Sequence, residues 1–320
     1  MKPDIIVAIP MSVPDLATLG QDYTVHHAPR PADRAAMFAH IGAGARALLT
    51  NGTIGLSATE MAMLPQLGIV ACQGAGFENV DRAAARARGI TVTHGPGTNA
   101  ACVADHAFAL LATAVRGIPA ADSAVRGGAW AEARGVRPAL NGKRLGIFGL
   151  GTIGTLIARR AAGFEMAIFY HNRRPRPDIS FPWQPSLTAL AAASDFLVIA
   201  TPGGAGTRHA VNAEVLAALG PGGFVVNIGR GSVIDTPALI AALTDGTIAG
   251  AALDVFEGEP DVPAALRALP NVVLTPHIAG RSPESAAATL DLARRNFAAY
   301  FAGRPVLTPV PAPVPQEDAP

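Results

Sequence analysis

The sequence LGIFGLGTIG at residues 145–154 combines a strand, a glycine turn and the start of a helix. The apolar run Leu145 to Phe148 leads directly into Gly149, Gly151 and Gly154, and a stretch of helical character follows from Thr155 to Ala162. In such a turn the first glycine permits a tight bend, the second lets the backbone approach a pyrophosphate, and the third lets helix and strand pack closely. The spacing alone is weak, but between a strand and a helix it predicts a dinucleotide-binding domain. The alternative is a glycine turn that holds no ligand.

Apolar runs of strand length alternate with Ala-rich stretches of helical length on both sides of this turn, which is typical of parallel βαβ units. The expected strands are Ile5–Ile9, Ala47–Thr50, Ile69–Cys72, Ile90–Thr93, Leu145–Phe148, Met166–Tyr170, Phe196–Ala200, Phe224–Ile228, Gly250–Leu253 and Val272–Leu274. We therefore predict an α/β fold class with two doubly wound parallel sheets. Between the two sets of strands, Ala100 to Val115 is apolar nearly all round, which indicates a helix buried at a domain junction or a subunit interface.

The overall composition narrows the class of protein. The chain has 320 residues, of which 50% are hydrophobic and 15% charged, and its 25 Lys and Arg against 24 Asp and Glu give a net charge of +1. This length predicts about two domains, and the balanced charge argues against nucleic-acid and membrane partners. The longest uncharged apolar stretches are too short to cross a bilayer. Cys72 and Cys102 form neither a disulfide framework nor a metal spacing, so we expect no metal and a cytoplasmic location.

The strand after the glycine turn bears on the choice of dinucleotide. An acid near its end would hydrogen-bond a ribose 2′-hydroxyl, but the sequence has Asn172, Arg173 and Arg174 there and no acid before Asp178. Since a carboxylate repels a 2′-phosphate and a guanidinium can bind one with two hydrogen bonds, we predict that NADP(H) is preferred over NAD(H). The alternative is that both arginines are solvated loop residues.

Polar side chains follow the last expected strands. Arg230, Asp254, Glu259 and His277 all fall beyond carboxyl ends of parallel strands, at the same edge as the glycine turn, where ligands bind in such sheets. Hydride addition to a carbonyl leaves charge on its oxygen, so the site needs an acid that is protonated near neutral pH. His277 fits this role with Glu259 as its partner, and Arg230 fits a substrate carboxylate. Taken singly, each has a plainer alternative as a capping, interface or loop residue.

Several longer strings extend these observations to a known family. The strings GLGTIG from Gly149, NIGRGSVID from Asn227, AALDVFEGEP from Ala251 and TPHIAGRSPES from Thr275 resemble the D-isomer-specific 2-hydroxyacid dehydrogenases. CQGAGFENVD from Cys72 and VADHAFALL from Val103 resemble that family's substrate loop and interdomain helix. The resemblance covers nearly the whole chain. The HNRR string makes the chain most similar to the NADPH-dependent glyoxylate and hydroxypyruvate reductases.

The resemblance implies an arrangement of domains and site residues. It assigns residues 1–99 and 286–320 to a substrate-binding domain and residues 100–285 to a Rossmann domain that carries the dimerisation helix, with a cleft between them. It implies Arg230, Glu259 and His277 as the catalytic triad. The expected substrate contacts are Asn51, Gly74, Ala75, Gly76, Arg230 and His277. The expected cofactor contacts are Leu150, Gly151, Thr152, Ile153, Asn172, Arg173, Arg174, Thr201, Pro202, Thr207, Ile228, Gly229, Arg230, Asp254, His277 and Gly280.

The expected activity is reduction of a small 2-oxoacid, glyoxylate or hydroxypyruvate, to the D-2-hydroxyacid with NADPH. A 2-ketogluconate reductase and an aromatic 2-oxoacid reductase of the phenylpyruvate type remain open, since they differ in the substrate pocket rather than in the chemistry. A dinucleotide-sensing, corepressor-like binding module is the alternative from another class, which a degraded triad would favour. The resemblance also implies a homodimer, in which Trp130 could reach the partner's site.

Overall fold

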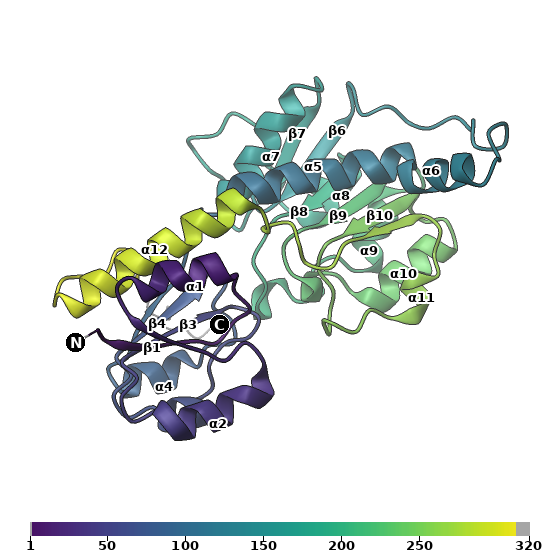
Figure 1. Cartoon of the computed structure of the whole chain (residues 1–320). Helices are drawn as coiled ribbons and strands as arrows, with labels where there is room; N and C mark the ends of the chain where they lie inside the picture. The colour runs from purple at the N-terminus through teal and green to yellow at the C-terminus, as the bar shows by residue number, and fades with distance from the viewer. Residues whose placement is uncertain (1, 312–320) are drawn as a thin grey trace. The chain divides into compact units, whose positions relative to one another are not determined.

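The computed structural model describes residues 2–311, and the chain forms two compact units (Figure 1). Unit 1 comprises residues Met1–Asn99 and Ser282–Pro320, and unit 2 comprises Ala100–Arg281. The sequence placed the return to the first unit at residue 286, and the structure places it at Ser282. Met1 and residues 312–320 of the predicted substrate-binding domain lie outside the described residues.

Unit 1 is built on a parallel sheet with the strand order β2-β1-β3-β4-β5. Its strands are β1 (Asp4–Val7), β2 (Thr24–His27), β3 (Ala47–Asn51), β4 (Ile69–Gln73) and β5 (Thr91–Thr93). Its helices are α1 (Val13–Gly20), α2 (Pro31–Ile41), α3 (Ala58–Ala62), α4 (Arg82–Ala87) and α12 (Pro283–Phe301). Alternating strand residues contribute to two separate cores, so helices cover both faces of the sheet. The core shared with α12 contains Ile5, Leu49 and Phe297.

Strand β2 was not among the expected strands. Its sequence, Thr-Val-His-His, has an exposed Thr24 and three half-buried residues, because it pairs only with β1 and lies at the edge of the sheet. The other strands are marked in the sequence by apolar runs, and an edge strand that faces water on one side lacks such a run. All of the expected strands are present, with ends within two residues of the predicted ones.

Unit 2 is built on a second parallel sheet with the strand order β11-β10-β9-β8-β6-β7. Its strands are β6 (Arg144–Phe148), β7 (Ala167–His171), β8 (Phe196–Ile199), β9 (Phe224–Asn227), β10 (Gly250–Leu253) and β11 (Val272–Leu274). Its helices are α5 (Ala100–Arg116), α6 (Ile118–Arg126), α7 (Thr152–Ala162), α8 (Leu187–Ala192), η1 (Ala205–Thr207), α9 (Ala213–Leu219), η2 (Gly231–Val233), α10 (Thr236–Thr244) and α11 (Ala264–Arg267). Two cores, one on each face of the sheet, hold these helices.

Helix α5 confirms the predicted buried helix and explains its composition. Val103, Ala107 and Leu111 are buried in the same core as Ile157 of α7 and Val226 of β9. The apolar surface of α5 is therefore largely buried against other elements of unit 2. Within the described residues, no single helix is both long and apolar enough to cross a membrane; α5 and α6 together pass that test by length and composition, as a pair bent by 60°.

The strand order of unit 2 reverses at β6, which pairs with β7 on one side and with β8 on the other. In open parallel sheets, ligands bind beyond the carboxyl ends of the strands at such a reversal. The glycine turn follows β6 directly. Because the strands are parallel, the segments that follow β7, β8, β9, β10 and β11 begin at the same edge of the sheet (Figure 1). This edge therefore holds the candidate site of unit 2.

Candidate active site

The glycine turn has the backbone geometry that a dinucleotide needs. Gly149 has a φ of +98°, and a Cβ built there would lie 2.7 Å from the Thr201 nitrogen. A Cβ on Gly154 would lie 2.3 Å from the Gly149 oxygen, so α7 packs against the turn at a distance that only glycine permits. At Gly151, by contrast, nothing lies within 4 Å of a built Cβ, and no side chain among the described residues caps α7. The uncapped helix N-terminus beside open space fits a pyrophosphate.

The segment after β7 places the three residues predicted to select the dinucleotide. The Asn172 side-chain oxygen accepts a hydrogen bond of 2.7 Å from the Leu150 N–H in the glycine turn. Arg173 and Arg174 are exposed, and neither forms a hydrogen bond or ion pair with any residue from 2 to 311. The Asn172 side chain is therefore hydrogen-bonded within the protein, whereas the guanidinium groups of Arg173 and Arg174 are available to a ligand.

The segments after β8 and β9 lie against each other. Thr201 is buried, and a Cβ on Gly229 would lie 2.5 Å from the Thr201 oxygen. The hydroxyl of Thr207 donates to the Pro202 oxygen at 2.8 Å, which closes the loop between them. Ile228 is buried, and the Gly229 N–H donates to Asn227 at 3.0 Å. The segments that carry these predicted cofactor contacts therefore pack against each other, and Thr201 packs against Gly149 of the glycine turn.

His277 and Glu259 form the acid pair that the sequence predicted. The His277 Nδ1 lies 2.7 Å from a Glu259 oxygen, and the other Glu259 oxygen accepts a hydrogen bond of 2.9 Å from the Phe256 N–H. Burial raises the pKa of Glu259, but the hydrogen bonds from His277 and Phe256 and the positive charges of His277 and Arg230 outweigh it, and the pKa is lowered overall. Glu259 is therefore ionised at neutral pH and holds the imidazole by Nδ1, which leaves Nε2 for a substrate.

Arg230 stands between β9 and the short helix η2. Its Nη1 donates to the Gly229 oxygen at 2.8 Å, and its own oxygen accepts from Asn227 at 3.0 Å, so both the side chain and the backbone are fixed locally. Its charge acts on Glu259, which places the three predicted catalytic residues in one electrostatic group. A guanidinium, a carboxylate and an imidazole grouped in this way can bind a carboxylate and donate a proton to a carbonyl oxygen.

Asp254 holds the backbone of the loop that carries His277. Its side chain is 1% exposed, and its two oxygens accept hydrogen bonds of 2.9 Å from the Ile278 and Ala279 N–H groups. The Thr275 hydroxyl donates to Asp254 at 2.6 Å, and the His106 Nε2 of α5 lies 3.0 Å from that hydroxyl. His277 has a φ of +52°, uncommon for a residue with a side chain, and these bonds stabilise it. The cofactor role predicted for Asp254, and for Gly280 just beyond this loop, stays a prediction.

A third cluster links the segments after β8 and β10. Glu257 forms an ion pair of 2.7 Å with Arg208, and the His209 Nε2 lies 3.0 Å from the other Glu257 oxygen. Burial raises the pKa of Glu257, but the hydrogen bonds from His209 and Arg208 lower it overall. The loop with Thr201 and Thr207 is therefore tied to the loop that leads to Glu259.

Unit 1 contains four of the predicted substrate contacts, Asn51, Gly74, Ala75 and Gly76. The Gly74 oxygen accepts a hydrogen bond from the Gly95 N–H at 2.6 Å, and the Ala75 oxygen lies 3.0 Å from the His94 Nδ1. Since the N–H and C=O of a trans peptide point in opposite directions, the N–H groups of Ala75 and Gly76 point away from β5. The Asn51 side-chain oxygen accepts from the Ile54 N–H at 2.8 Å, so a substrate contact by Asn51 would use its amide nitrogen.

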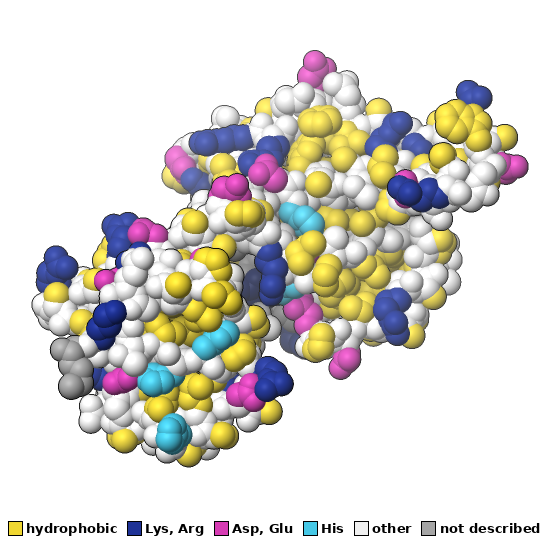
Figure 2. All heavy atoms as spheres, viewed as in Figure 1, with side chains coloured by type: hydrophobic (Ala, Val, Ile, Leu, Met, Phe, Trp, Pro, Cys, Tyr) yellow, Lys and Arg dark blue, Asp and Glu magenta, His cyan; other side chains and the backbone are white. Residues whose placement is uncertain are grey.

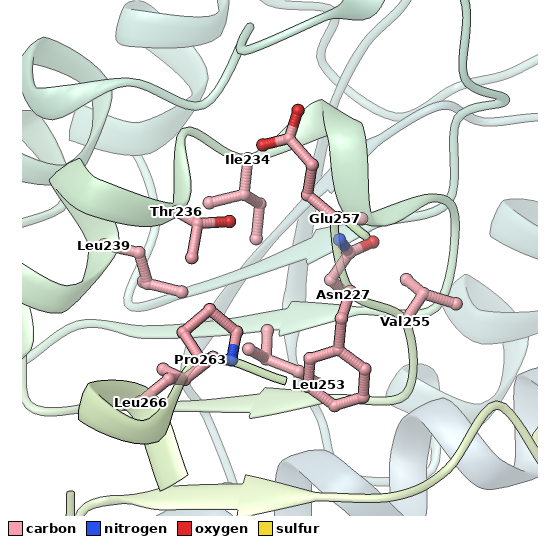
Figure 3. Close-up of a pocket in the computed structure, with 11 residues that line it drawn as sticks. Asn227, Ile234, Thr236, Leu239, Leu253, Val255, Glu257, Pro263 and Leu266 are labelled. Atoms are coloured by element: carbon pink, nitrogen blue, oxygen red, sulfur yellow. The ribbon is translucent and has the colours of Figure 1, made fainter. Parts of the chain in front are cut away.

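A small, mainly apolar pocket lies behind the segments of Arg230 and Glu257 (Figure 3). Leu239, Leu253 and Leu266 line it, and all three belong to one core of unit 2. Figure 3 shows the Glu257 carboxylate directed away from these side chains, in agreement with its ion pair to Arg208. The pocket is therefore a feature of core packing beside the site rather than a place for a polar substrate.

Metal and thiol chemistry have no support in the described part of the chain. Residues 2–311 contain no group of three or more His, Cys, Asp or Glu side chains that could hold a metal ion. Cys72 is buried in β4, and burial raises the pKa of its thiol to about 12, so it is not a nucleophile at neutral pH.

Some residues of this site were not found from the sequence. Arg176 donates from Nη1 to the Leu150 oxygen at 2.9 Å and forms an ion pair with Asp178, yet only its neighbours Arg173 and Arg174 were singled out. His106 is a polar interruption of the apolar run from Ala100 to Val115, and it was not predicted to contribute to the site. That interruption was the available signal, because a polar residue on a buried helix face requires a partner.

The sequence profile of the D-isomer specific 2-hydroxyacid dehydrogenase NAD-binding domain matches residues 108–279, which lie within unit 2. The chain is 41% identical over 266 residues to a glyoxylate/hydroxypyruvate reductase A of Arabidopsis thaliana, covering 83% of this chain and 85% of that protein. It is 36% identical over 310 residues to a 2-ketogluconate reductase of Gluconobacter oxydans, covering 97% and 99%.

Among solved structures, the chain is similar to an NADPH-dependent glyoxylate/hydroxypyruvate reductase of Sinorhizobium meliloti in complex with NADP and malonate. The two share 42% sequence identity with a TM-score of 0.89, and the match covers 97% of each chain. These comparisons confirm the family resemblance and the fold class that the motifs predicted.

Proposed function

Because the chain belongs to the D-isomer specific 2-hydroxyacid dehydrogenase family and is an NAD(P)-dependent oxidoreductase, we propose that it reduces glyoxylate or hydroxypyruvate to the 2-hydroxyacid, in the case of hydroxypyruvate to the D-isomer, with NADPH. The observation that carries this proposal is the His277–Glu259 pair, 2.7 Å apart, within the electrostatic reach of Arg230 and at the same sheet edge as the glycine turn. The similarity to reductases of these two 2-oxoacids supports the choice of substrate.

The reduced nicotinamide supplies the hydride when it is bound. His277 donates a proton from Nε2 to the carbonyl oxygen, because its Nδ1 is held by Glu259. Arg230 binds the substrate carboxylate and orients the carbonyl, since a guanidinium can form two parallel hydrogen bonds with a carboxylate. The N–H groups of Gly74, Ala75 and Gly76 in unit 1 are also proposed to bind substrate, and the hydrogen-bonded carbonyl groups of Gly74 and Ala75 support this for Ala75 and Gly76.

NADPH is favoured over NADH in this proposal. Arg173 and Arg174 are exposed and have no protein partner among residues 2–311, so no internal ion pair has to break before they bind a 2′-phosphate. The similar structure from Sinorhizobium meliloti contains NADP, which supports the same choice.

Steady-state kinetics on a panel of 2-oxoacids tests both parts. Glyoxylate, hydroxypyruvate, 2-ketogluconate and phenylpyruvate are each assayed with NADPH and with NADH. We expect the highest kcat/KM for glyoxylate or hydroxypyruvate with NADPH. A higher kcat/KM with NADH would contradict the cofactor assignment, and preference for a sugar acid or an aromatic 2-oxoacid would contradict the substrate assignment.

A 2-ketogluconate reductase is the second candidate. The relative of that name matches 97% of this chain and 99% of its own length, a longer match than that of the plant reductase. We expect the two candidates to differ in the substrate pocket rather than in the chemistry, so the substrate panel separates them.

The assembly and the location complete the proposal. Figure 2 shows hydrophobic side chains at the surface near the α5–α6 region of unit 2. In the segment that follows α6, Trp130 is 66% exposed and Val136 is 96% exposed, and exposed apolar side chains that gather in one patch mark protein interfaces. A homodimer is therefore proposed, and light scattering of wild type and Trp130→Ser tests it. A monomeric wild type would contradict the dimer, whereas a dimer that Trp130→Ser weakens supports it. The proposed cytoplasmic location rests on Cys72 and Cys102, which are both free cysteines.

A further inference from the structure

The Leu150 residue of the glycine turn is held from both sides by the segment after β7. Its N–H donates to the Asn172 side-chain oxygen at 2.7 Å, and its oxygen accepts from the Arg176 Nη1 at 2.9 Å. Leu150 itself is buried, so neither group can exchange these bonds for water. Two side chains from one loop therefore fix the backbone of the residue between Gly149 and Gly151.

The loop that supplies these side chains is itself anchored. The buried Tyr170 hydroxyl accepts from the Arg176 N–H at 2.8 Å, and the Trp183 indole donates to the Asn172 oxygen at 3.1 Å. Trp183 also stacks on His171, with ring centroids 6.4 Å apart. Asp178 forms an ion pair with the Arg176 guanidinium. Asn172 and Arg176 thus reach the glycine turn from a braced segment, and Arg173 and Arg174 lie between them in sequence.

We propose that Asn172 and Arg176 are positioning residues that couple the loop selecting the nucleotide to the turn that binds its pyrophosphate. This inference rests on the proposed dinucleotide role of the glycine turn. Asn172 does not contact the 2′-position in this proposal; it holds Leu150 while adding no charge. The pair therefore acts on any nicotinamide dinucleotide, whereas Arg173 and Arg174 act on the 2′-phosphate alone.

The choice of asparagine follows from this double requirement. The bond to Leu150 needs only an acceptor oxygen, which aspartate would supply equally well. Aspartate would also place a negative charge next to Arg173 and Arg174 and repel a 2′-phosphate. Asparagine is the residue of that shape that keeps the acceptor without the charge.

Fluorescence titration of the full-length protein with NADPH and with NADH tests the proposal without any 2-oxoacid. Asn172→Ala removes the acceptor, and we expect the Kd of both nucleotides to rise by about fivefold, the effect of one hydrogen bond. Asn172→Asp restores the acceptor, so the Kd of NADH should return to within about twofold of wild type, while that of NADPH stays at least about tenfold higher.

One further variant tests the other half of the pair, and a second serves as a control. Arg176→Met removes the donor to Leu150 and should raise the Kd of both nucleotides, again by about fivefold. Asp178→Asn keeps the Arg176 donor and should change neither Kd by more than about twofold. Melting temperatures of all variants separate a loss of affinity from a loss of folded protein, and Asn172→Asp and Arg176→Met carry the test if Asn172→Ala does not fold.

Defined outcomes overturn the proposal. If Asn172→Ala weakens NADPH alone, Asn172 contacts the 2′-phosphate directly; if Asn172→Asp weakens NADH as much as Asn172→Ala does, the acceptor bond is not what matters. Unchanged affinities in Arg176→Met remove Arg176 from the pair. Wild-type protein that binds a nucleotide but reduces no 2-oxoacid contradicts the proposed function alone, whereas equal affinities of wild type and Asn172→Ala contradict the coupling alone.

Discussion

Two groups of charged residues at the same sheet edge differ in how they are held. Beyond β10 and β11, Asp254, Glu259 and His277 have protein partners at 2.6 to 2.9 Å. Beyond β7, Arg173 and Arg174 are exposed and have no such partner among the described residues.

The difference corresponds to what each group has to do. Proton donation requires one imidazole nitrogen at a fixed place before the substrate arrives, so the protein supplies the partners. A charge that recognises a phosphate is satisfied by the phosphate itself, and a protein partner there would compete with the ligand. Substitutions in the paired group should therefore affect the rate or the stability, and substitutions in the open group should affect only nucleotide affinity.

The largest effect is expected at His277. His277→Ala removes the proton donor and should lower kcat by roughly 10²- to 10⁴-fold, because general acid catalysis contributes about that much. Stopped-flow and steady-state measurements of NADPH oxidation give kcat, and nucleotide titration serves as the control. Full turnover in this variant would mean that another group donates the proton.

Substitution of Asp254 should have the largest effect on the stability of the protein. Asp254→Ala leaves the buried N–H group of Ala279 and the half-buried N–H group of Ile278 without an acceptor and should lower the free energy of unfolding by about 3 kcal/mol. Urea denaturation measures this change. Thr275→Val, which removes one donor to the same carboxylate, should cost less; an equal loss in both variants would show that Asp254 does not hold the loop.

Glu259 should make stability depend on pH. Because its pKa in the folded state is lowered, its contribution is fully present above its ordinary pKa and is lost as the pH falls through the lowered value. Glu259→Gln should therefore be less stable than wild type at pH 7, by about 1.5 kcal/mol, and the difference should shrink in acid. Denaturation at pH 7 and at pH 3 tests this; a constant difference would contradict it.

The open group should give the smallest and most selective effect. Replacing Arg173 and Arg174 together by Ala should raise the KM for NADPH about tenfold, the loss of a charge-assisted contact, and leave the KM for NADH and the melting temperature unchanged. A parallel rise in both KM values would place the two arginines among the general nucleotide contacts and remove the distinction between the groups.

The sequence predicted the fold class, nearly all strands and the pairing of His277 with Glu259, because these depend on local patterns and on the rule that parallel strands end at one edge. It did not predict β2, whose edge position leaves it without a buried apolar run. It also missed the partners of Asn172 and Asp254. Those partners, Leu150 for the one and Thr275 and Ile278 for the other, are brought close only by strand pairing, and their chemistry is that of ordinary backbone and hydroxyl groups.

Helix α12 has a consequence for the order of folding. Its Leu290 and Phe297 complete a core with Ile5 and Leu49, so unit 2 is an insertion within the chain of unit 1. During synthesis, the first 99 residues emerge with one face of their sheet covered only in part, by α1, and the helix that completes this core is made only after the whole of unit 2. Unit 2 is contiguous and can fold on the ribosome first, although it begins second. The nucleotide-binding unit would then be folded before α12 packs against the N-terminal sheet.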